Sequence, residues 1–201
     1  MHLTRAVSQI SEIHEHLVKG EVYRGYRALP IAASGLVGLA AALLQPAFVW
    51  PGGPAGFVGY WLVVAAIAGL TGMGEIPFNY LFRDDAEARR RTRRVVGQFA
   101  PCLAAGVAAG WAFAAVGRPA IDLLPGVWTL IFALGVFASR PYLPRATGWV
   151  GLFYFLAGAY LLVDTANSLH HAAWRLAGTF AVGQLATALV LYSNLERDEH
   201  A

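Results

Sequence analysis

Charged residues are scarce in this sequence. They make up 13% of its 201 residues, whereas about 25% is usual in a soluble domain. This scarcity excludes a water-soluble surface over most of the chain. The formal charge of +3 gathers beside apolar segments and not in a separate basic domain, so we expect no nucleic-acid partner.

Cysteine and histidine are also few, and their positions exclude several kinds of site. Cys102 is the single cysteine, which rules out a disulfide framework within the chain. The six histidines, His2, His14, His16, His170, His171 and His200, all lie outside the long apolar segments. A haem held between two membrane-embedded histidines is therefore excluded.

Recognisable catalytic motifs are absent as well. The sequence has no His-Glu-x-x-His zinc motif, no Gly-x-Ser-x-Gly nucleophile motif and no glycine-rich phosphate loop. We therefore expect no catalytic residue, no metal and no cofactor. One alternative stays open in a single loop, where Asp164, His170 and His171 could bind a metal ion or respond to pH.

Long apolar runs are what the sequence has instead. Hydrophobic residues make up 57% of the chain, and the mean hydropathy is +0.52. A bilayer core about 30 Å thick needs roughly 20 apolar residues per helix, and six stretches come close to this length: 29–50, 56–73, 95–116, 121–138, 147–163 and 174–192. We predict an all-α, polytopic membrane protein with six transmembrane helices over residues 29–192.

The basic residues predict the orientation of these helices. If the N-terminus lies in the cytoplasm, thirteen of the fifteen Lys and Arg residues fall on the inner side, and the outer loops receive only Arg118 and Arg175. The inner residues are Arg5, Lys19, Arg24, Arg27, Arg83, Arg89, Arg90, Arg91, Arg93, Arg94, Arg140, Arg145 and Arg197. Because short cytoplasmic loops carry the excess of positive charge, we expect both termini in the cytoplasm of a cell, as in a bacterial cytoplasmic membrane.

Residues 1–28 and 193–201 flank the membrane domain. In the first, Leu3, Ala6, Ile10, Ile13 and Leu17 recur at intervals of three and four, which predicts an amphipathic cytoplasmic helix followed by a juxtamembrane step. We expect this helix to be retained, since no signal-peptide pattern precedes it. It could lie on the inner headgroups, pack against cytoplasmic loops, or bind a partner. Residues 193–201 form a short cytoplasmic tail.

An arginine-rich segment precedes the third apolar stretch. It contains Arg83, Arg89, Arg90, Arg91, Arg93 and Arg94. Asp84 or Asp85 can cap a helix here, so we expect the third transmembrane helix to begin in the cytoplasm and run without a break into the bilayer. The arginines are predicted to contact anionic lipid headgroups. The alternative is a docking site for an acidic protein or a phosphorylated headgroup.

Few polar residues lie within the predicted spans. Glu75 follows the second stretch; if that helix continues to Phe82 with a bend at Pro77, Glu75 is drawn below the headgroups and becomes a functional candidate. Otherwise it is an interfacial carboxylate paired with an arginine. Asn79, Gln98 and Gln184 complete a candidate polar lining, although such side chains more often join helices by hydrogen bonds.

The third stretch also carries small residues at regular spacing. Cys102, Gly106, Gly110 and Ala114 are each four residues apart, which places them along one side of a helix. Small side chains allow two helix backbones to approach closely. The stripe predicts a helix contact, either within the chain or between two copies.

The sequence favours a non-enzymatic membrane protein that acts as a scaffold, regulator or accessory subunit. Its expected contacts are the lipid bilayer, anionic headgroups through the basic cytoplasmic face, and a protein partner or a second copy. One alternative is a carrier of a small solute or lipid lined by Glu75, Asn79, Gln98 and Gln184. A second, an intramembrane enzyme, needs convergent reactive groups at one depth, and Glu75 alone does not provide them.

Overall fold

The chain folds into a bundle of helices. The computed structural model describes residues 26–49, 53–82, 86–118, 120–164 and 169–196, and no strand occurs in these ranges. The helices are α2 (Ala28–Val49), α3 (Gly53–Met73), α4 (Ile76–Phe82), α5 (Ala86–Val116), α6 (Ala120–Ser139), the 3₁₀ turn η1 (Arg140–Tyr142), α7 (Thr147–Val163), α8 (Leu169–Leu191) and the π turn η2 (Tyr192–Glu196). The prediction of an all-α fold is confirmed. The predicted N-terminal amphipathic helix and the last five residues lie outside the described ranges.

Five of these helices are long and apolar enough to cross a membrane: α2, α3, α5, α6 and α8. Helices of this length and composition indicate a membrane protein. The fifth predicted stretch forms α7, which is apolar but has 17 residues. Each of the six helices begins and ends within a few residues of the predicted stretch, except that α5 and α8 start earlier.

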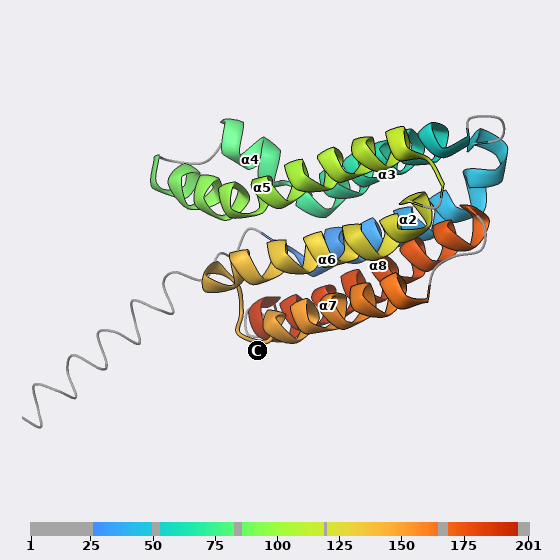
Figure 1. Cartoon of the computed structure of the whole chain (residues 1–201). Helices are drawn as coiled ribbons and strands as arrows, with labels where there is room; N and C mark the ends of the chain where they lie inside the picture. The colour runs from blue at the N-terminus through green and yellow to red at the C-terminus, as the bar shows by residue number, and fades with distance from the viewer. Residues whose placement is uncertain (1–25, 50–52, 83–85, 119, 165–168, 197–201) are drawn as a thin grey trace, which may run out of the picture.

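The six longer helices, α2, α3, α5, α6, α7 and α8, run in alternating directions, as Figure 1 shows. α2 packs between α3 and α8, and α6 packs between α5 and α7. Contacts of α8 with α6 and α7, and of α3 with α5, join the two groups. Ala28 at the start of α2 lies in one cluster with Ala188 and Leu191 at the end of α8. We call the end of the bundle that contains Ala28 and Leu191 the basic end. The far end of the same helices is called the opposite end.

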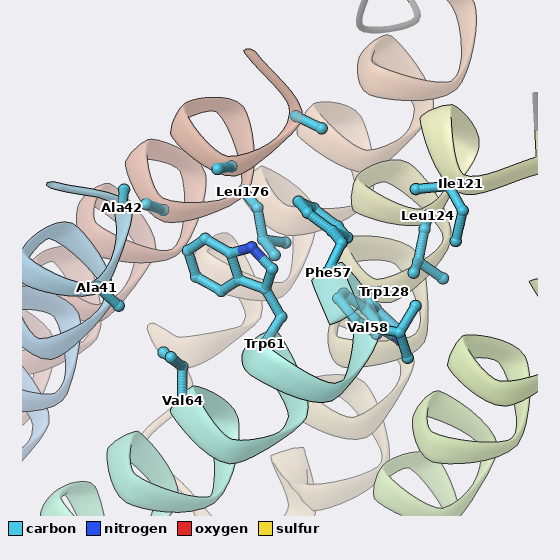
Figure 2. Close-up of a cluster of buried hydrophobic side chains, with 13 residues drawn as sticks. Ala41, Ala42, Phe57, Val58, Trp61, Val64, Ile121, Leu124, Trp128 and Leu176 are labelled. Carbon is cyan, nitrogen blue, oxygen red and sulfur yellow. The ribbon is translucent and has the colours of Figure 1, made fainter. Parts of the chain in front are cut away.

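A large apolar cluster fills the half of the bundle near the opposite end (Figure 2). Phe57 and Trp61 of α3 point into it, and Leu124 and Trp128 of α6 meet them. The hydroxyl of Tyr60 donates a hydrogen bond of 2.6 Å to the carbonyl of Ala41 on α2. The cluster therefore joins α2, α3, α6 and α8.

A second cluster is built around Tyr154 of α7, whose side chain is fully buried. Its ring lies 4.8 Å from that of Phe132 on α6 and 5.4 Å from that of Phe180 on α8. Gly183 of α8 faces this ring so closely that a methyl group there would overlap it. The absence of a side chain at Gly183 thus provides the space for Tyr154.

Glycines also shape the contact between α6 and α7. A methyl group added at Gly126 would lie 2.8 Å from the side chain of Leu162, and one at Gly158 would lie 2.8 Å from Leu130. These distances are shorter than carbon atoms tolerate. Large side chains of one helix therefore fill notches left by glycines of the other, as is common between helices in membranes.

The polypeptide breaks between α3 and α4 at Gly74. Gly74 has a φ of 54°, a left-handed conformation that glycine adopts readily, and it packs against Pro30. The alternative in which the second helix continues to Phe82 with a bend at Pro77 does not hold, because Pro77 lies in the first turn of α4, where proline is well tolerated. Glu75 consequently lies in the turn between two helices and not within a continuing span.

Candidate functional site

Four of the eight exposed arginines that the structure describes lie on the first turns of α5. Arg89, Arg90, Arg93 and Arg94 are exposed, whereas Thr92 and Val95 are buried against the bundle. α5 continues without a break for 31 residues, from Ala86 to Val116, which confirms the predicted continuous helix. The side chain of Arg91 and all of Arg83 lie outside the described part. The arginines are therefore held on a rigid extension of an apolar helix.

The short helix α4 lies beside this arginine-rich turn. Arg89 donates a hydrogen bond of 3.2 Å to the carbonyl of Leu81, one of the last carbonyls of α4, which have no partner within a helix. The Arg89 guanidinium also lies 6.0 Å from the centre of the Tyr80 ring, within range of a cation–π contact. Phe78 and Phe82 are exposed next to one another, with ring centres 5.1 Å apart.

Glu75 lies at the same end of the bundle, and its partner is Arg27 at the start of α2. The two charged groups are 4.0 Å apart, and their side chains are 64% and 68% exposed. Exposed pairs of this kind contribute about 0 to 1 kcal/mol. The arrangement fits the interpretation of Glu75 as an interfacial carboxylate beside an arginine.

The structure spreads the candidate polar lining over several elements. Asn79 lies on α4, Gln98 is exposed on α5, and the Cβ of Gln184 on α8 faces Gly35 of α2. Among the described residues, no hydrogen bond or ion pair connects the side chain of Glu75, Asn79, Gln98 or Gln184 to that of another of these four. Nothing in these contacts assembles the four into one site.

The small-residue stripe of α5 contacts other helices of the same chain. The indole nitrogen of Trp128 on α6 donates a hydrogen bond of 2.8 Å to the carbonyl of Gly106. A methyl group added at Gly110 would lie 3.0 Å from the Trp128 ring and 3.2 Å from Val58 on α3. Cys102, one turn earlier, is partly buried. Gly106 and Gly110 thus form an internal contact with α6 and α3.

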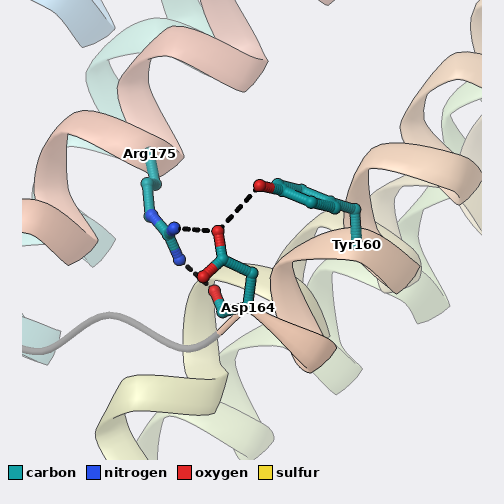
Figure 3. Close-up of polar contacts among 3 residues, drawn as sticks. All are labelled: Tyr160, Asp164 and Arg175. Atoms are coloured by element: carbon teal, nitrogen blue, oxygen red, sulfur yellow. Dashed lines mark hydrogen bonds and ion pairs between the residues drawn. The ribbon is translucent and has the colours of Figure 1, made fainter.

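At the opposite end, a network of three side chains ties α7 to α8 (Figure 3). Arg175 of α8 forms an ion pair with Asp164 and also donates to its backbone carbonyl. The Tyr160 hydroxyl donates to the same carboxylate at 2.8 Å. The hydrogen bond from Tyr160, and next the hydrogen bond and charge of Arg175, lower the pKa of Asp164.

This network was not predicted from the sequence. The sequence groups Asp164 with His170 and His171 because they share a loop, but Arg175 lies a turn farther along and reaches back. His170 instead accepts a hydrogen bond of 3.2 Å from the indole nitrogen of Trp174. The described residues contain no group of three His, Cys, Asp or Glu side chains that could hold a metal ion.

The second arginine at the opposite end is paired as well. Arg118 donates hydrogen bonds of 3.3 and 2.5 Å to the carboxylate of Asp122, which lies in the first turn of α6, where a negative charge is favourable. Arg118 and Arg175 are thus each neutralised by a local aspartate. The arginines of α5 have no such matching set of described acidic partners.

We expect the contribution of Asp164 to stability to depend on pH. Folding lowers the pKa of this carboxyl from its unfolded value of about 3.9. The carboxylate therefore stabilises the fold at pH values above the unfolded pKa, and this contribution is lost as the pH falls through the folded pKa. In detergent micelles, Asp164→Asn should lower the melting temperature at pH 7, and the difference from the parent should shrink below about pH 4. A difference that stays constant down to pH 2.5 would contradict this assignment.

The exposed arginines of α5, together with α4, form the arrangement that the described residues offer most clearly for contact with another molecule. Comparison with protein-family models, characterised proteins and solved structures finds no match to this chain.

Proposed function

We propose that this chain is a non-enzymatic membrane protein that acts as a scaffold, regulator or accessory subunit through a basic cytoplasmic face. This face consists of α4 and the exposed arginines Arg89, Arg90, Arg93 and Arg94. The observation that carries the proposal is that these arginines stand on one continuous helix that also enters the apolar bundle. Their position relative to the membrane is therefore determined by the span itself.

The chemistry of the basic face fits an anionic membrane surface. Each Lys or Arg near such a surface contributes about 1 kcal/mol. α4 exposes the rings of Phe78 and Phe82 and places the Tyr80 ring 6.0 Å from the Arg89 guanidinium. Tyrosine is one of the residues that favour the headgroup level of a membrane. We infer that α4 lies in the inner interface and that the arginines bind anionic headgroups or an acidic segment of a partner.

We also propose that all six apolar helices cross the membrane, with both termini in the cytoplasm. The 17 residues of α7 extend about 25 Å at 1.5 Å per residue, which is at the short end of the range for a transmembrane helix. Arg118 and Arg175 are paired with aspartates at the opposite end. These features support placing the basic end in the cytoplasm of a cell membrane, in line with the positive-inside rule.

The proposed orientation predicts which positions an impermeant thiol reagent can reach. In a Cys102→Ala background, Ala55→Cys lies at the opposite end and Ser193→Cys at the basic end, and both positions are exposed. In intact cells, we expect the reagent to label Ala55→Cys and to label Ser193→Cys only after the membrane is opened. Labelling of both positions in intact cells would contradict the topology.

The arginines of the basic face should bind anionic lipid through their charge. Replacing Arg90, Arg93 and Arg94 with Gln should lower the retention of anionic over zwitterionic lipid by the purified protein about tenfold or more, since each charge contributes about 1 kcal/mol. Replacing the same three with Lys should leave retention close to that of the parent.

The two arginine variants separate a general surface attraction from a specific one. Lys keeps the charge but lacks the planar fork that grips a phosphate or carboxylate at two points. A large loss in the Lys variant would indicate a specific phosphate or carboxylate ligand in place of general attraction. Unchanged lipid retention in the Gln variant would contradict the proposed role of the basic face.

The contacts among the described residues support this role over a carrier or an enzyme. A carrier would need Glu75, Asn79, Gln98 and Gln184 around one polar path, and an intramembrane enzyme would need reactive groups that converge at one depth. Among the described residues these four are spread over the α3–α4 turn, α4, α5 and α8.

A further inference from the structure

α5 turns an unusually large surface away from the bundle. Of the residues in its apolar span, 6% are buried, against 28–39% in the other four helices long enough to cross a membrane. Its contacts are with α6 on one side and, less extensively, with α3 and α4. Figure 1 shows it at the edge of the bundle. Most of its circumference therefore has no partner within the described chain.

Small residues occupy the centre of this outward face. We define the outer seam of α5 as a set of exposed positions separated alternately by three and four residues: Arg94, Gly97, Pro101, Ala104, Ala108, Trp111 and Ala115. This spacing keeps all seven along one line of the helix. The outer seam lies on the other side of α5 from Gly106 and Gly110, which contact α6 and α3 within the chain.

The outward faces of α7 and α8 are different. α8 exposes Val182, Leu185 and Leu189, and α7 exposes Phe155 and Leu156. These are the large apolar side chains expected against lipid, whereas small residues are enriched where two membrane helices meet. The part of the outer seam from Gly97 to Ala108 therefore has the small residues typical of a helix contact, and larger side chains of α5, among them Leu103, Val107 and Trp111, are exposed along and beside it.

The backbone of the outer seam also offers a hydrogen-bond acceptor. Pro101 lies inside α5 and has no N–H to donate to the carbonyl of Gly97. No side chain whose hydrogen bonds the structure describes donates to this carbonyl. A backbone group freed in this way within a membrane helix is usually satisfied by a neighbouring helix or by a polar side chain.

Charge indicates which kind of helix fits the outer seam. At the basic end, the seam continues into the exposed residues Arg90, Arg93 and Arg94. Two copies of this chain have the same orientation in a membrane, so a symmetric contact through α5 would bring the two sets of arginines together. Like charges at that distance are unfavourable, whereas acidic residues on the neighbour would be complementary.

We propose that the outer seam of α5 docks a transmembrane helix of a partner protein whose cytoplasmic juxtamembrane segment is acidic. The small residues allow close approach of the partner's backbone, and the arginines select its acidic end. The inference rests on the proposed function, because it identifies the partner that the basic face would hold. It adds the surface within the bilayer at which that partner binds.

The test uses the full chain in zwitterionic phosphatidylcholine vesicles, so that lipid charge does not compete. The probe is a synthetic single-span peptide with Gly and Ala along one face and four Asp or Glu residues at its cytoplasmic end. A matched peptide carries Lys at those four positions. Energy transfer between a dye on Ser193→Cys, in the Cys102→Ala background, and a dye on the peptide reports association.

We expect the acidic peptide to associate about tenfold or more strongly than the Lys peptide, because several charge pairs are gained and as many repulsions removed. Ala104→Leu together with Ala108→Leu should weaken the association of the acidic peptide by about tenfold or more, because bulky side chains separate the two backbones. Ala40→Leu together with Ala66→Leu, which enlarges exposed alanines on α2 and α3, should leave it unchanged.

Two outcomes would overturn the inference. Unchanged association of the peptide in the Ala104→Leu, Ala108→Leu variant would show that the outer seam is not the docking surface. Energy transfer between copies of the full chain that disappears in this variant would show that a second copy occupies the seam. Failure of the proposed function itself is distinguishable, because it appears as lipid retention that does not depend on the arginines.

Discussion

Replacing Gly183 with alanine is expected to destabilise the bundle by about 3 kcal/mol, at the upper end of the range for overpacking a filled interior. The added methyl group would overlap the ring of Tyr154, which is fully buried. Tyr154 has little freedom to move, because Phe132, Phe153 and Phe180 surround its ring at 4.8 to 5.5 Å. The strain must therefore separate α7 from α8.

Gly178 provides a matched control on the same helix. A methyl group added there meets no atom within 4 Å, so Gly178→Ala should change stability little. The free energy of unfolding is measured by titration with a denaturing detergent in mixed micelles. Combining Gly183→Ala with Tyr154→Ala should be less destabilising than the sum of the two single changes, because they act on one contact. Additive effects would contradict the proposed overlap.

Replacing Trp128 with alanine is expected to reduce stability by about 4 kcal/mol, as for other buried aromatic residues. The side chain is 9% exposed and lies in the apolar cluster with Phe57 and Leu124. Its ring also covers Gly110, and its indole nitrogen donates to the carbonyl of Gly106. The change would therefore remove a contact between α5 and α6 that combines packing with a hydrogen bond.

A smaller substitution separates packing from hydrogen bonding at this position. Trp128→Phe keeps much of the ring but lacks the N–H, so we expect a loss that includes about 1 kcal/mol for the hydrogen bond. Trp149, on α7, is 75% exposed, and Trp149→Ala serves as the control, with little expected effect. If Trp128→Ala were as mild as the control, α5 would not depend on this contact, and the described packing of α5 would be wrong.

One local feature followed from the residue pattern, and two others did not. The α5 extension was predictable because acidic residues precede a run of arginines and no helix-breaking residue lies between them and the apolar span. The pairing of Arg118 with Asp122 was not predicted, although the two residues have the spacing of four that allows an ion pair on a helix. The break before α4 was not predicted: a bend at Pro77 was one alternative, whereas the left-handed turn lies at Gly74, one of many glycines in the chain.

Other contacts join residues that are far apart in the chain and have no local pattern. Asp164 meets Arg175 across a loop, Trp128 reaches the carbonyl of Gly106, and Tyr154 enters the space beside Gly183. Glycines are frequent in this chain, with 22 in total, so their presence does not reveal which of them face a neighbour. Only the packing of the helices identifies these sites.

Hydropathy and the distribution of arginines were enough to predict a helical membrane protein, the approximate bounds of its apolar helices and a basic face at one end. They could not show which side of each helix faces protein, because the lipid around a bundle is as apolar as its interior. The outward exposure of the α5 seam and the burial of Tyr154 were decided by tertiary packing. Shape complementarity between side chains determines which side of each helix faces protein, and hydropathy does not measure shape.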